Sequence, residues 1–505
     1  MSFLDQFGYF FQSLGTLVIN PTAMALLFGS VFMGIIFGAM PGLTATLGVA
    51  LLTTLTYGMS FNLALIALLG VYVGGVYGGS YASILLNIPG TAASAATALD
   101  GYPLAKQGKG GIALGLTTTA STIGTIIGMM FVVALAPMIS NIARQFTSFE
   151  FFLLAFFGII ISGTLTSPDL VIKGWIAGFI GLFLAVIGRD SLFFYPRFTF
   201  GLAELDGGLD IVPVLIGAFG IPQIIQVIRD NMKSDDTQKL DRIVPEWRAV
   251  GRNIPTIIRS SLIGVGIGAV PGIGEDIAGW VSYGTAKNSS KHPETFGKGE
   301  LTGVIASETA NNACIGGAMI PLLSLGVPGS PPAAMLLGAF MLHGVQPGPM
   351  LNIDQPGFVL QLSAILLLAS IAMYILGILL AKQVVKILKI PTSIFMPVIA
   401  VLCILGSYAL SLRVFNLYLM VIVGLVTFFL TEMKYPVAPL VIGVILGPMA
   451  DQNLRRALLV SQGSLAPIFQ RPVTLILFIV IVMTVLSQTK IYKIAMARLK
   501  GKFTR

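Results

Sequence analysis

Three carboxylates lie in otherwise apolar parts of the sequence. Glu275 and Asp276 follow a Pro-Gly step, and Glu308 is followed by the charge-free residues 309–353. An intramembrane carboxylate is costly and usually marks an ion or proton pathway. These side chains can bind Na⁺ or carry a proton. Glu275 and Asp276 can equally cap a helix start, where acids are favourable, whereas we expect Glu308 to be functional.

Pro-Gly steps recur at four places that match between the two halves of the sequence, each with hydroxyl or amide side chains nearby. Such side chains can bind carboxylate oxygens or a coupling cation, although Ser and Thr in membrane helices often bond to their own backbone. We predict that the ion-coupling residues are the three carboxylates above. The predicted substrate-binding residues are Pro41, Gly42, Leu43, Thr44, Thr46, Asn87, Pro89, Gly90, Thr91, Ser94, Pro271, Gly272, Asn311, Asn312, Pro328, Gly329 and Ser330.

Two of these steps predict helix starts inside apolar sequence. Thr91 can cap a helix of small residues, and Ser330 can cap one that begins with Pro331 and Pro332. A helix start carries about half a positive charge and free N–H donors, which suit an anion. Residues 6–99 and 309–353 contain no Lys or Arg, so the backbone is the expected source of positive charge. Alternatively, each step only kinks a helix for packing.

The elements that must position these residues are membrane spans. The chain has 505 residues, of which 55% are hydrophobic and 10% are charged. Residues 6–99 have no charged side chain at all, and a span needs only about 20 apolar residues. The composition predicts a polytopic protein in a lipid bilayer.

The sequence also contains an internal repeat. Residues 38–43 match 268–273, and residues 84–91 match 323–330 in the same order. The polar segment 229–252 separates the two copies. We therefore predict a first transmembrane repeat at 1–228, a cytoplasmic linker at 229–254 and a second repeat at 255–471. A final transmembrane helix and a basic cytoplasmic tail are expected at 472–505.

Loop charges predict that the two copies are inverted. The basic tail 490–505 belongs in the cytoplasm by the positive-inside rule. Counting spans backward from it places the uncharged loop 344–353 outside, whereas its basic counterpart 106–109 should be inside. Inverted repeats with broken helices are typical of secondary transporters. Arg455 and Arg456, which this count places outside, fit the rule poorly.

Other functions find little support in the residues. Cys314, Cys403, His292 and His343 are the four cysteines and histidines, and they form no spacing suited to a metal centre. The net charge of +9 comes from basic residues between apolar runs, so nucleic-acid binding is not expected. No cofactor is expected beyond Na⁺ as a coupling ion.

The chain resembles the large membrane subunit of the tripartite tricarboxylate transporter family over nearly its whole length. The motifs that carry the resemblance are Pro41–Gly48, Tyr77–Ser80, Asn87–Thr91, Asp100–Leu104, Pro271–Gly274, Gly326–Ser330, Gly447–Met449 and Asn453–Leu458. The resemblance implies a bacterial inner-membrane carrier that works with a small membrane subunit and a periplasmic solute-binding protein. It further implies that carboxylates such as citrate are carried by an ion gradient.

The combined prediction is an all-α polytopic membrane protein with two inverted-topology repeats, discontinuous or hairpin helices and roughly 10–14 membrane segments. Its function would be the import of an organic di- or tricarboxylate with a cation gradient, Na⁺ in preference to H⁺. It is not expected to be an enzyme, because no Ser/His pair, Asp dyad or metal cluster is evident. A passive anion channel, an intramembrane enzyme and a structural scaffold are the alternatives.

Overall fold

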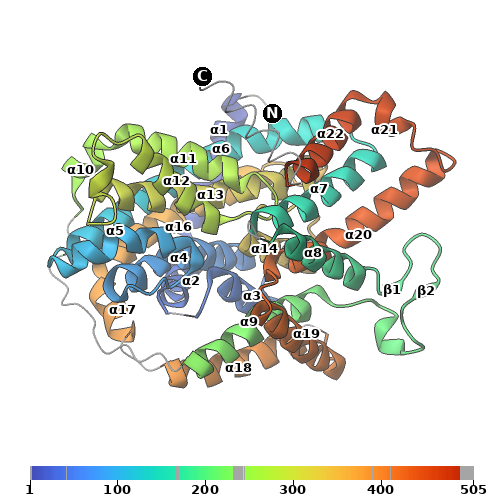
Figure 1. Ribbon diagram of the computed structural model, residues 1–505, viewed down its shortest axis with the longest axis horizontal. Coiled ribbons are helices and arrows are strands. Elements are labelled where there is room, and N and C mark those ends of the chain that lie inside the picture. The colour runs from blue at the N-terminus through green and yellow to red at the C-terminus, as the bar shows by residue number, and fades with distance from the viewer. Residues whose placement is uncertain are drawn as a thin grey trace. The chain divides into compact units, whose positions relative to one another are not determined.

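The computed structural model describes residues 3–40, 42–166, 170–230, 243, 245–388, 392–409 and 411–488. These residues are helical apart from loops and one small antiparallel hairpin, in which β1 (Gly188–Arg189) pairs with β2 (Pro196–Arg197). Pro41, half of the predicted linker and the basic tail lie outside the described residues. Figure 1 shows the order of the helices along the chain.

Eight of the described helices are long and apolar enough to cross a bilayer. They are α2 (Pro21–Ala39), α4 (Phe61–Leu86), α6 (Gly110–Ala143), α7 (Ser148–Thr166), α9 (Ile211–Asp230), α16 (Phe358–Leu379), α19 (Val414–Glu432) and α20 (Val437–Val460). Seven shorter apolar helices of 10–17 residues accompany them. Shorter helices of this kind suit segments that enter a membrane and break there. The predicted polytopic, helical class is confirmed.

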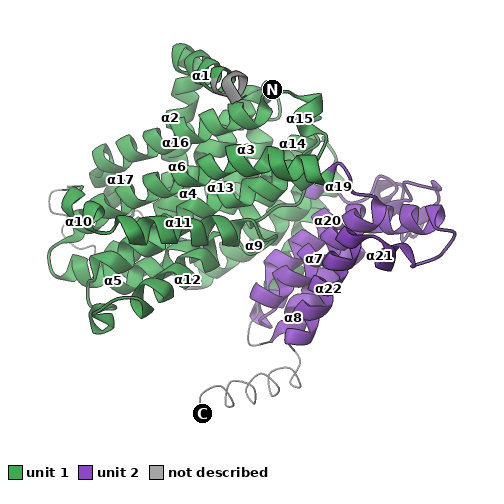
Figure 2. Cartoon of the chain, turned by 90° about the horizontal axis from the view of Figure 1, so that it is seen from above, with its two compact units in different colours: residues 1–143, 212–428 green, residues 144–211, 429–505 purple. Residues whose placement is uncertain are grey.

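The chain divides into two compact units, drawn in different colours in Figure 2. Unit 1 comprises Met1–Ala143 and Val212–Phe428. Its helices are α1 (Phe3–Ile19), α2 (Pro21–Ala39), α3 (Ala45–Leu55), α4 (Phe61–Leu86), η1 (Ala92–Ser94), α5 (Ala95–Lys106), α6 (Gly110–Ala143), α9 (Ile211–Asp230), α10 (Trp247–Arg252), α11 (Ile254–Gly268), α12 (Glu275–Asn288), η3 (Pro293–Thr295), α13 (Leu301–Leu325), α14 (Pro331–Leu342), α15 (Leu351–Asp354), α16 (Phe358–Leu379), α17 (Ala381–Leu388), α18 (Thr392–Ala409) and α19 (Val414–Glu432).

Unit 2 comprises Arg144–Ile211 and Phe429–Arg505. It holds the β-hairpin together with α7 (Ser148–Thr166), α8 (Val171–Ala185), η2 (Ala203–Leu205), α20 (Val437–Val460), α21 (Pro467–Gln470) and α22 (Pro472–Ser487). Helix α20 packs against both α7 and α8, and α22 packs against α7. Each unit therefore joins a segment of the first predicted repeat to a segment of the second.

Two long helices, α4 and α13, form the centre of unit 1. Both are buried along almost their whole length, and α4 is apolar on every side, as expected of an interior helix. Helix α2 packs along α4, whereas α6 and α11 pack along α13. The two central helices end at left-handed residues, Asn87 (φ 57°) and Gly326 (φ 72°), which is the usual way to close a helix before a sharp turn.

The helices break where the Pro-Gly steps predict. Gly42 and Gly272 adopt positive φ angles of 86° and 79°, which glycine reaches without the steric penalty of a Cβ. After these turns, α3 begins with Thr44 as its cap and α12 begins after Gly274. The predicted helix start at Ser330 is confirmed, since its Oγ accepts the Ala333 N–H at 3.3 Å. Thr91 likewise precedes a new helical segment, η1.

Glycines let the broken segments touch backbone to backbone. A Cβ on Gly38 would overlap the Gly75 carbonyl, and one on Gly90 would overlap the Gly38 carbonyl. In the second half of the chain, a Cβ on Gly329 would overlap the Gly268 carbonyl in the same way. Carbonyl groups are rigid, so side chains at these positions would have to separate the helices.

Gly268 and its neighbour Gly266 give a direct test of this packing. A Cβ at Gly268 would strike the backbone of α13, whereas a Cβ at Gly266 meets nothing within 4 Å. We expect Gly268→Ala to destabilise the protein by about 1–3 kcal/mol through overpacking. Gly266→Ala should be neutral or slightly stabilising, because Ala favours the helix. Thermal unfolding of the two purified variants in detergent measures both effects, and equal melting temperatures would contradict the proposed contact.

Candidate functional site

The starts of α12 and α14 meet around one buried carboxylate. Glu275, the first residue of α12, accepts a hydrogen bond from the Tyr72 hydroxyl on α4. The same hydroxyl lies 2.8 Å from Ser330 Oγ, which caps α14. The Gly274 N–H donates to the Gly329 carbonyl at 3.1 Å. Two of the four predicted breaks are thus joined by direct hydrogen bonds.

The other breaks are joined to the opposite half of the chain in a comparable way. Asn311 on α13 donates through Nδ2 to the Ala93 carbonyl in η1 at 3.3 Å. Ser94 Oγ accepts from Ser83 Oγ at 2.8 Å and donates to the Thr91 carbonyl at 2.9 Å. Segment η1 packs against α12, and α3 packs against α14. Each broken segment therefore lies beside a broken segment of the other half.

Glu308 lies within α13 and is fully buried among hydroxyl groups. One of its oxygens accepts from Thr97 on α5, and the other accepts from Ser121 on α6 at 2.9 Å. Thr97 Oγ1 lies 3.1 Å from Ser307 Oγ. Residues from three helices, distant in sequence, therefore surround this carboxylate.

Neither Glu275 nor Glu308 forms an ion pair with Lys or Arg among the described residues. Positive potential near Glu275 comes instead from the starts of α12 and α14. Groups of three or more His, Cys, Asp or Glu side chains suited to a metal ion are absent from the part of the chain that the structure describes. The chemistry available is hydrogen bonding by hydroxyls, amides and helix starts around single carboxylates.

The structure does not bring all predicted residues together. Asp276 is exposed although its neighbour Glu275 is buried, and Asn87 and Pro89 are also exposed. Two other predicted residues have local roles, since Thr44 caps α3 and Gly42 lies against Val227. The remaining ones lie at the breaks or on the interior helices: Leu43, Thr46, Pro271, Gly272, Asn312 and Pro328.

Several partners of these residues were not predicted from the sequence. Tyr72, Thr97 and Ser121 contact the carboxylates from positions about 190–210 residues away in the chain. They lie in apolar helices without a motif of their own. The one signal was that Tyr72, a residue with a polar hydroxyl, lies in a charge-free run.

Asp100 joins the two halves at another place. Its Oδ1 accepts the backbone N–H groups of Gly297, Gly299 and Glu300 at 2.8–2.9 Å. Its Oδ2 accepts from the Tyr283 hydroxyl at 2.9 Å. Asp100 is fully buried, so it fastens α5 to the loop before α13 and to α12.

Replacing Asp100 should weaken this connection. In Asp100→Asn the backbone donors keep a neutral acceptor, but the charge and the acceptor for Tyr283 are lost. Hydrogen bonds to charged groups contribute about 1.5–3 kcal/mol each, so we expect a clear fall in the melting temperature. Asp354→Asn, at an exposed position, is the control and should change little. A melting temperature unchanged in both variants would contradict a structural role for Asp100.

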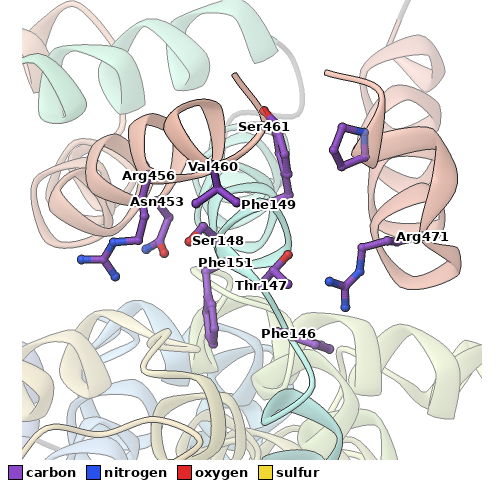
Figure 3. Close-up of a pocket in the computed structure, with 12 residues that line it drawn as sticks. Phe146, Thr147, Ser148, Phe149, Phe151, Asn453, Arg456, Val460, Ser461 and Arg471 are labelled. Atoms are coloured by element: carbon purple, nitrogen blue, oxygen red, sulfur yellow. The ribbon is translucent and has the colours of Figure 1, made fainter. Parts of the chain in front are cut away.

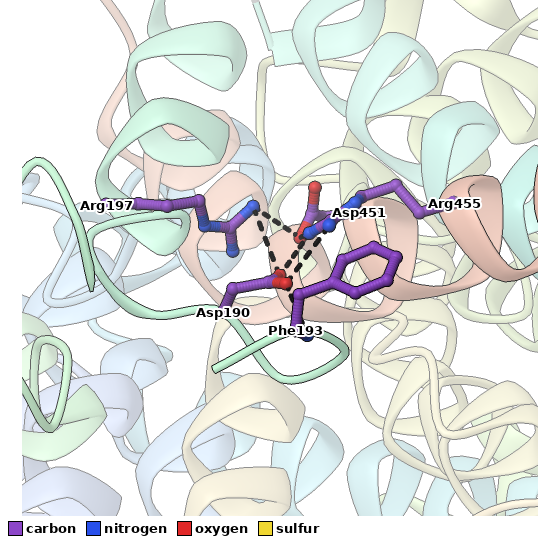
Figure 4. A network of polar contacts seen from close by, with 5 residues as sticks. All are labelled: Asp190, Phe193, Arg197, Asp451 and Arg455. Carbon is purple, nitrogen blue, oxygen red and sulfur yellow. Dashed lines mark hydrogen bonds and ion pairs between the residues drawn. The ribbon is translucent and has the colours of Figure 1, made fainter. Parts of the chain in front are cut away.

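Unit 2 contains a network of two acids and two arginines, shown in Figure 4. Asp190 accepts from both terminal nitrogens of Arg455, one at 3.0 Å, and from the Phe193 N–H at 2.7 Å. Arg197 binds Asp451 at 2.9 Å. The hydrogen bonds from Arg455 lower the pKa of Asp190 below its usual range. The network ties the loop after α8 to α20.

This lowered pKa makes stability depend on pH in a defined direction. A carboxylate with a depressed folded-state pKa stabilises the protein above its unfolded pKa of about 3.9, and the contribution is lost as the pH falls through the folded value. We expect Asp190→Asn to lower the melting temperature at pH 7, and the difference from wild type to vanish in strong acid. Asp206→Asn, in an exposed pair with Arg189, should have little effect. If the melting temperatures of wild type and Asp190→Asn still differed below the folded-state pKa of Asp190, ionisation of this carboxyl would be excluded as the cause.

A cavity of about 590 Å³ also lies within unit 2 (Figure 3). Its lining combines the aromatic residues Phe146, Phe149 and Phe151 with the polar residues Asn453, Arg456 and Arg471. None of the predicted site residues lines it. Arg471 binds Glu150 at 3.0 Å, so part of its positive charge is already compensated.

The fold and the sites define a class of protein: a polytopic helical membrane protein whose central helices are interrupted within apolar sequence. The tripartite tricarboxylate transporter TctA family matches residues 24–442. The chain belongs to this family, whose members are the large membrane subunits of tripartite tricarboxylate transporters. The resemblance seen in the sequence is confirmed, and the chain is a transporter component rather than an enzyme.

Two similar proteins come from Agrobacterium vitis. An uncharacterized 52.8 kDa protein in the TAR-I ttuC' 3' region is 34% identical over 458 residues, which cover 90% of this chain and 91% of that protein. An uncharacterized protein in the TAR-II ttuC' 3' region is 35% identical over 207 residues, or 41% of this chain and 86% of that protein. No solved structure matches the chain.

Proposed function

We propose that this chain is the permease of a secondary active transporter that imports an organic di- or tricarboxylate with a cation gradient. The observation that carries the proposal is the meeting of the α12 and α14 starts at Glu275, Tyr72 and Ser330. Helix starts favour anions, and they supply this preference without a buried arginine. The substrate-binding residues would be those around the four breaks.

The position of Glu275 gives a reason for coupling. Its carboxylate lies beside the start of α14, where an incoming carboxylate would also bind. Two like charges disfavour each other strongly in a buried site. A proton or cation that neutralises Glu275 would relieve this repulsion, so substrate and cation would enter together.

Matched contacts support the proposed internal repeat, whereas its proposed inversion rests on the loop charges. Gly38 and Gly268 each approach the following long helix, and Gly90 and Gly329 each approach those two glycines. Farther along, Gly217 of α9 lies against Met420 of α19, and Gly443 of α20 lies against Gly178 of α8. In each case a helix of one predicted repeat packs against a helix of the other. We retain 1–228 and 255–471 as the repeats, with 229–254 as a cytoplasmic linker and 472–505 as a final helix and tail.

The partners and the location are part of the proposal. The tripartite family implies a small membrane subunit and a periplasmic solute-binding protein that delivers the carboxylate. The bacterial inner membrane is the location that fits such a system and the relatives from Agrobacterium vitis. Alternating access would follow from movement of one group of helices against another.

Uptake into proteoliposomes tests the function. With the two partner subunits present, a labelled carboxylate such as citrate should accumulate against its gradient when a Na⁺ or proton gradient is imposed. A passive channel would only equilibrate the label. Panels of di- and tricarboxylates, each with and without the Na⁺ gradient, would identify the substrate.

Gly329→Leu should abolish this uptake, because bulk at that position strikes the Gly268 carbonyl and blocks the start of α14. Ser330→Ala, a milder change, should reduce uptake while the protein still folds, since it removes the cap and the contact with Tyr72. The control is Gly266→Leu, at an exposed position on α11. Full uptake by Ser330→Ala and by correctly folded Gly329→Leu would rule out the proposed site.

A further inference from the structure

We propose that the hydroxyl cluster around Glu308 is a sodium site, separate from the carboxylate-binding region at Glu275. The inference rests on the proposed cation coupling and adds an ion that Glu308 holds without substrate, distinct from the proton or cation that would enter at Glu275 together with the carboxylate. The cluster consists of the Glu308 carboxylate with Ser80, Thr97, Ser121 and Ser307, contributed by α4, α5, α6 and α13. All of its ligand atoms are oxygens, which hard cations prefer.

Three of the four hydroxyls in this cluster donate their protons to identified acceptors. Thr97 and Ser121 donate to the Glu308 carboxylate. Ser307 donates to the carbonyls of its own helix, at 3.0 Å from Gly303 and 3.1 Å from Val304. Because the protons of Thr97, Ser121 and Ser307 are used, the oxygen lone pairs of these three hydroxyls remain available to a cation.

Ser80 adds a fourth hydroxyl to this cluster from α4. Its side chain is fully buried, and its hydroxyl is close enough to the Glu308 carboxylate for a weak hydrogen bond. Its Oγ has no partner with good hydrogen-bond geometry among the described residues. Buried hydroxyls are usually well satisfied, and a cation held at Glu308 would use this weakly bonded oxygen.

The position of Glu308 within its helix distinguishes it from Glu275. Glu275 begins α12, where the helix start already stabilises a negative charge. Glu308 lies two turns inside α13 and has no such compensation. A buried carboxylate with hydroxyl donors but no opposite charge remains unfavourable, so a cation is needed at Glu308 more than at Glu275.

The charge and composition of the cluster favour a monovalent ion. One carboxylate balances one Na⁺, whereas a Ca²⁺ ion would leave a net positive charge and normally takes more carboxylate ligands. The cluster also has more oxygen groups than a bound proton would need. A protonated carboxyl requires only one acceptor for its O–H group, whereas four hydroxyls surround Glu308. Because the ligands come from both predicted halves, bound Na⁺ would hold α13 against α5 and α6.

Binding of ²²Na⁺ to the purified full-length chain, in detergent and without any carboxylate, tests the site. Wild type should bind ²²Na⁺ saturably, and Glu308→Gln should lose this binding. Ser121→Ala, which keeps the carboxylate, should raise the half-saturating Na⁺ concentration about tenfold or more. Thr119→Ala is the matched control, since this hydroxyl on the same helix bonds only to the Gly115 carbonyl. It should bind Na⁺ like wild type.

Glu275→Gln completes the set and should retain ²²Na⁺ binding. The site is overturned if wild type shows no saturable binding, or if folded Glu308→Gln and Ser121→Ala bind as wild type does. These outcomes are separate from the transport proposal. Sodium binding that depends on Glu308, without any carboxylate uptake in proteoliposomes, would support the site and refute the proposed function. Sodium-driven uptake by wild type together with normal ²²Na⁺ binding by Glu308→Gln would support the proposed function and refute the site at Glu308.

Discussion

Backbone groups freed at a helix break inside apolar surroundings must find partners within the protein, and this constraint shapes the centre of unit 1. The breaks satisfy it by lying against one another, as in the hydrogen bond from Gly274 to Gly329. Such contacts need backbone to approach backbone, which explains glycine at Gly38, Gly90 and Gly268. A set of paired helix starts follows from this packing, and the proposed preference for anions rests on it.

The two halves of the chain break at matched Pro-Gly steps but carry different chemistry. Glu275 and Glu308 both belong to the second half, and the groups that contact them from the first half are hydroxyls, among them Tyr72 and Thr97. Residue Asn311 reaches back to η1 through an amide instead of an acid. Breaks at matched places can therefore hold one carboxylate near a helix start and another among neutral oxygens, which are two different chemical environments.

The sequence predicted the breaks because proline and glycine act locally, and the cap at Ser330 follows from its position before Pro331 and Pro332. It singled out Glu308 because a charge in an apolar run is unusual. It could not separate Glu275 from Asp276, since adjacent residues differ in burial only through packing. Thr97 and Ser121 were missed because they are ordinary in helices until tertiary contacts bring them to Glu308. The cavity and arginine network of unit 2 depend on packing in the same way.

Disulfide trapping across the two halves tests the central arrangement most directly. A Cβ at Gly279 of α12 would lie 3.9 Å from the Ala96 Cβ of α5, close to the spacing of a natural disulfide. With a protease site introduced between residues 231 and 242, oxidised Ala96→Cys/Gly279→Cys should stay in one piece after cleavage. Ala96→Cys/Gly284→Cys should separate, because a Cβ at Gly284 meets nothing within 4 Å. Separation of both pairs would show that the broken segments of the two halves do not meet.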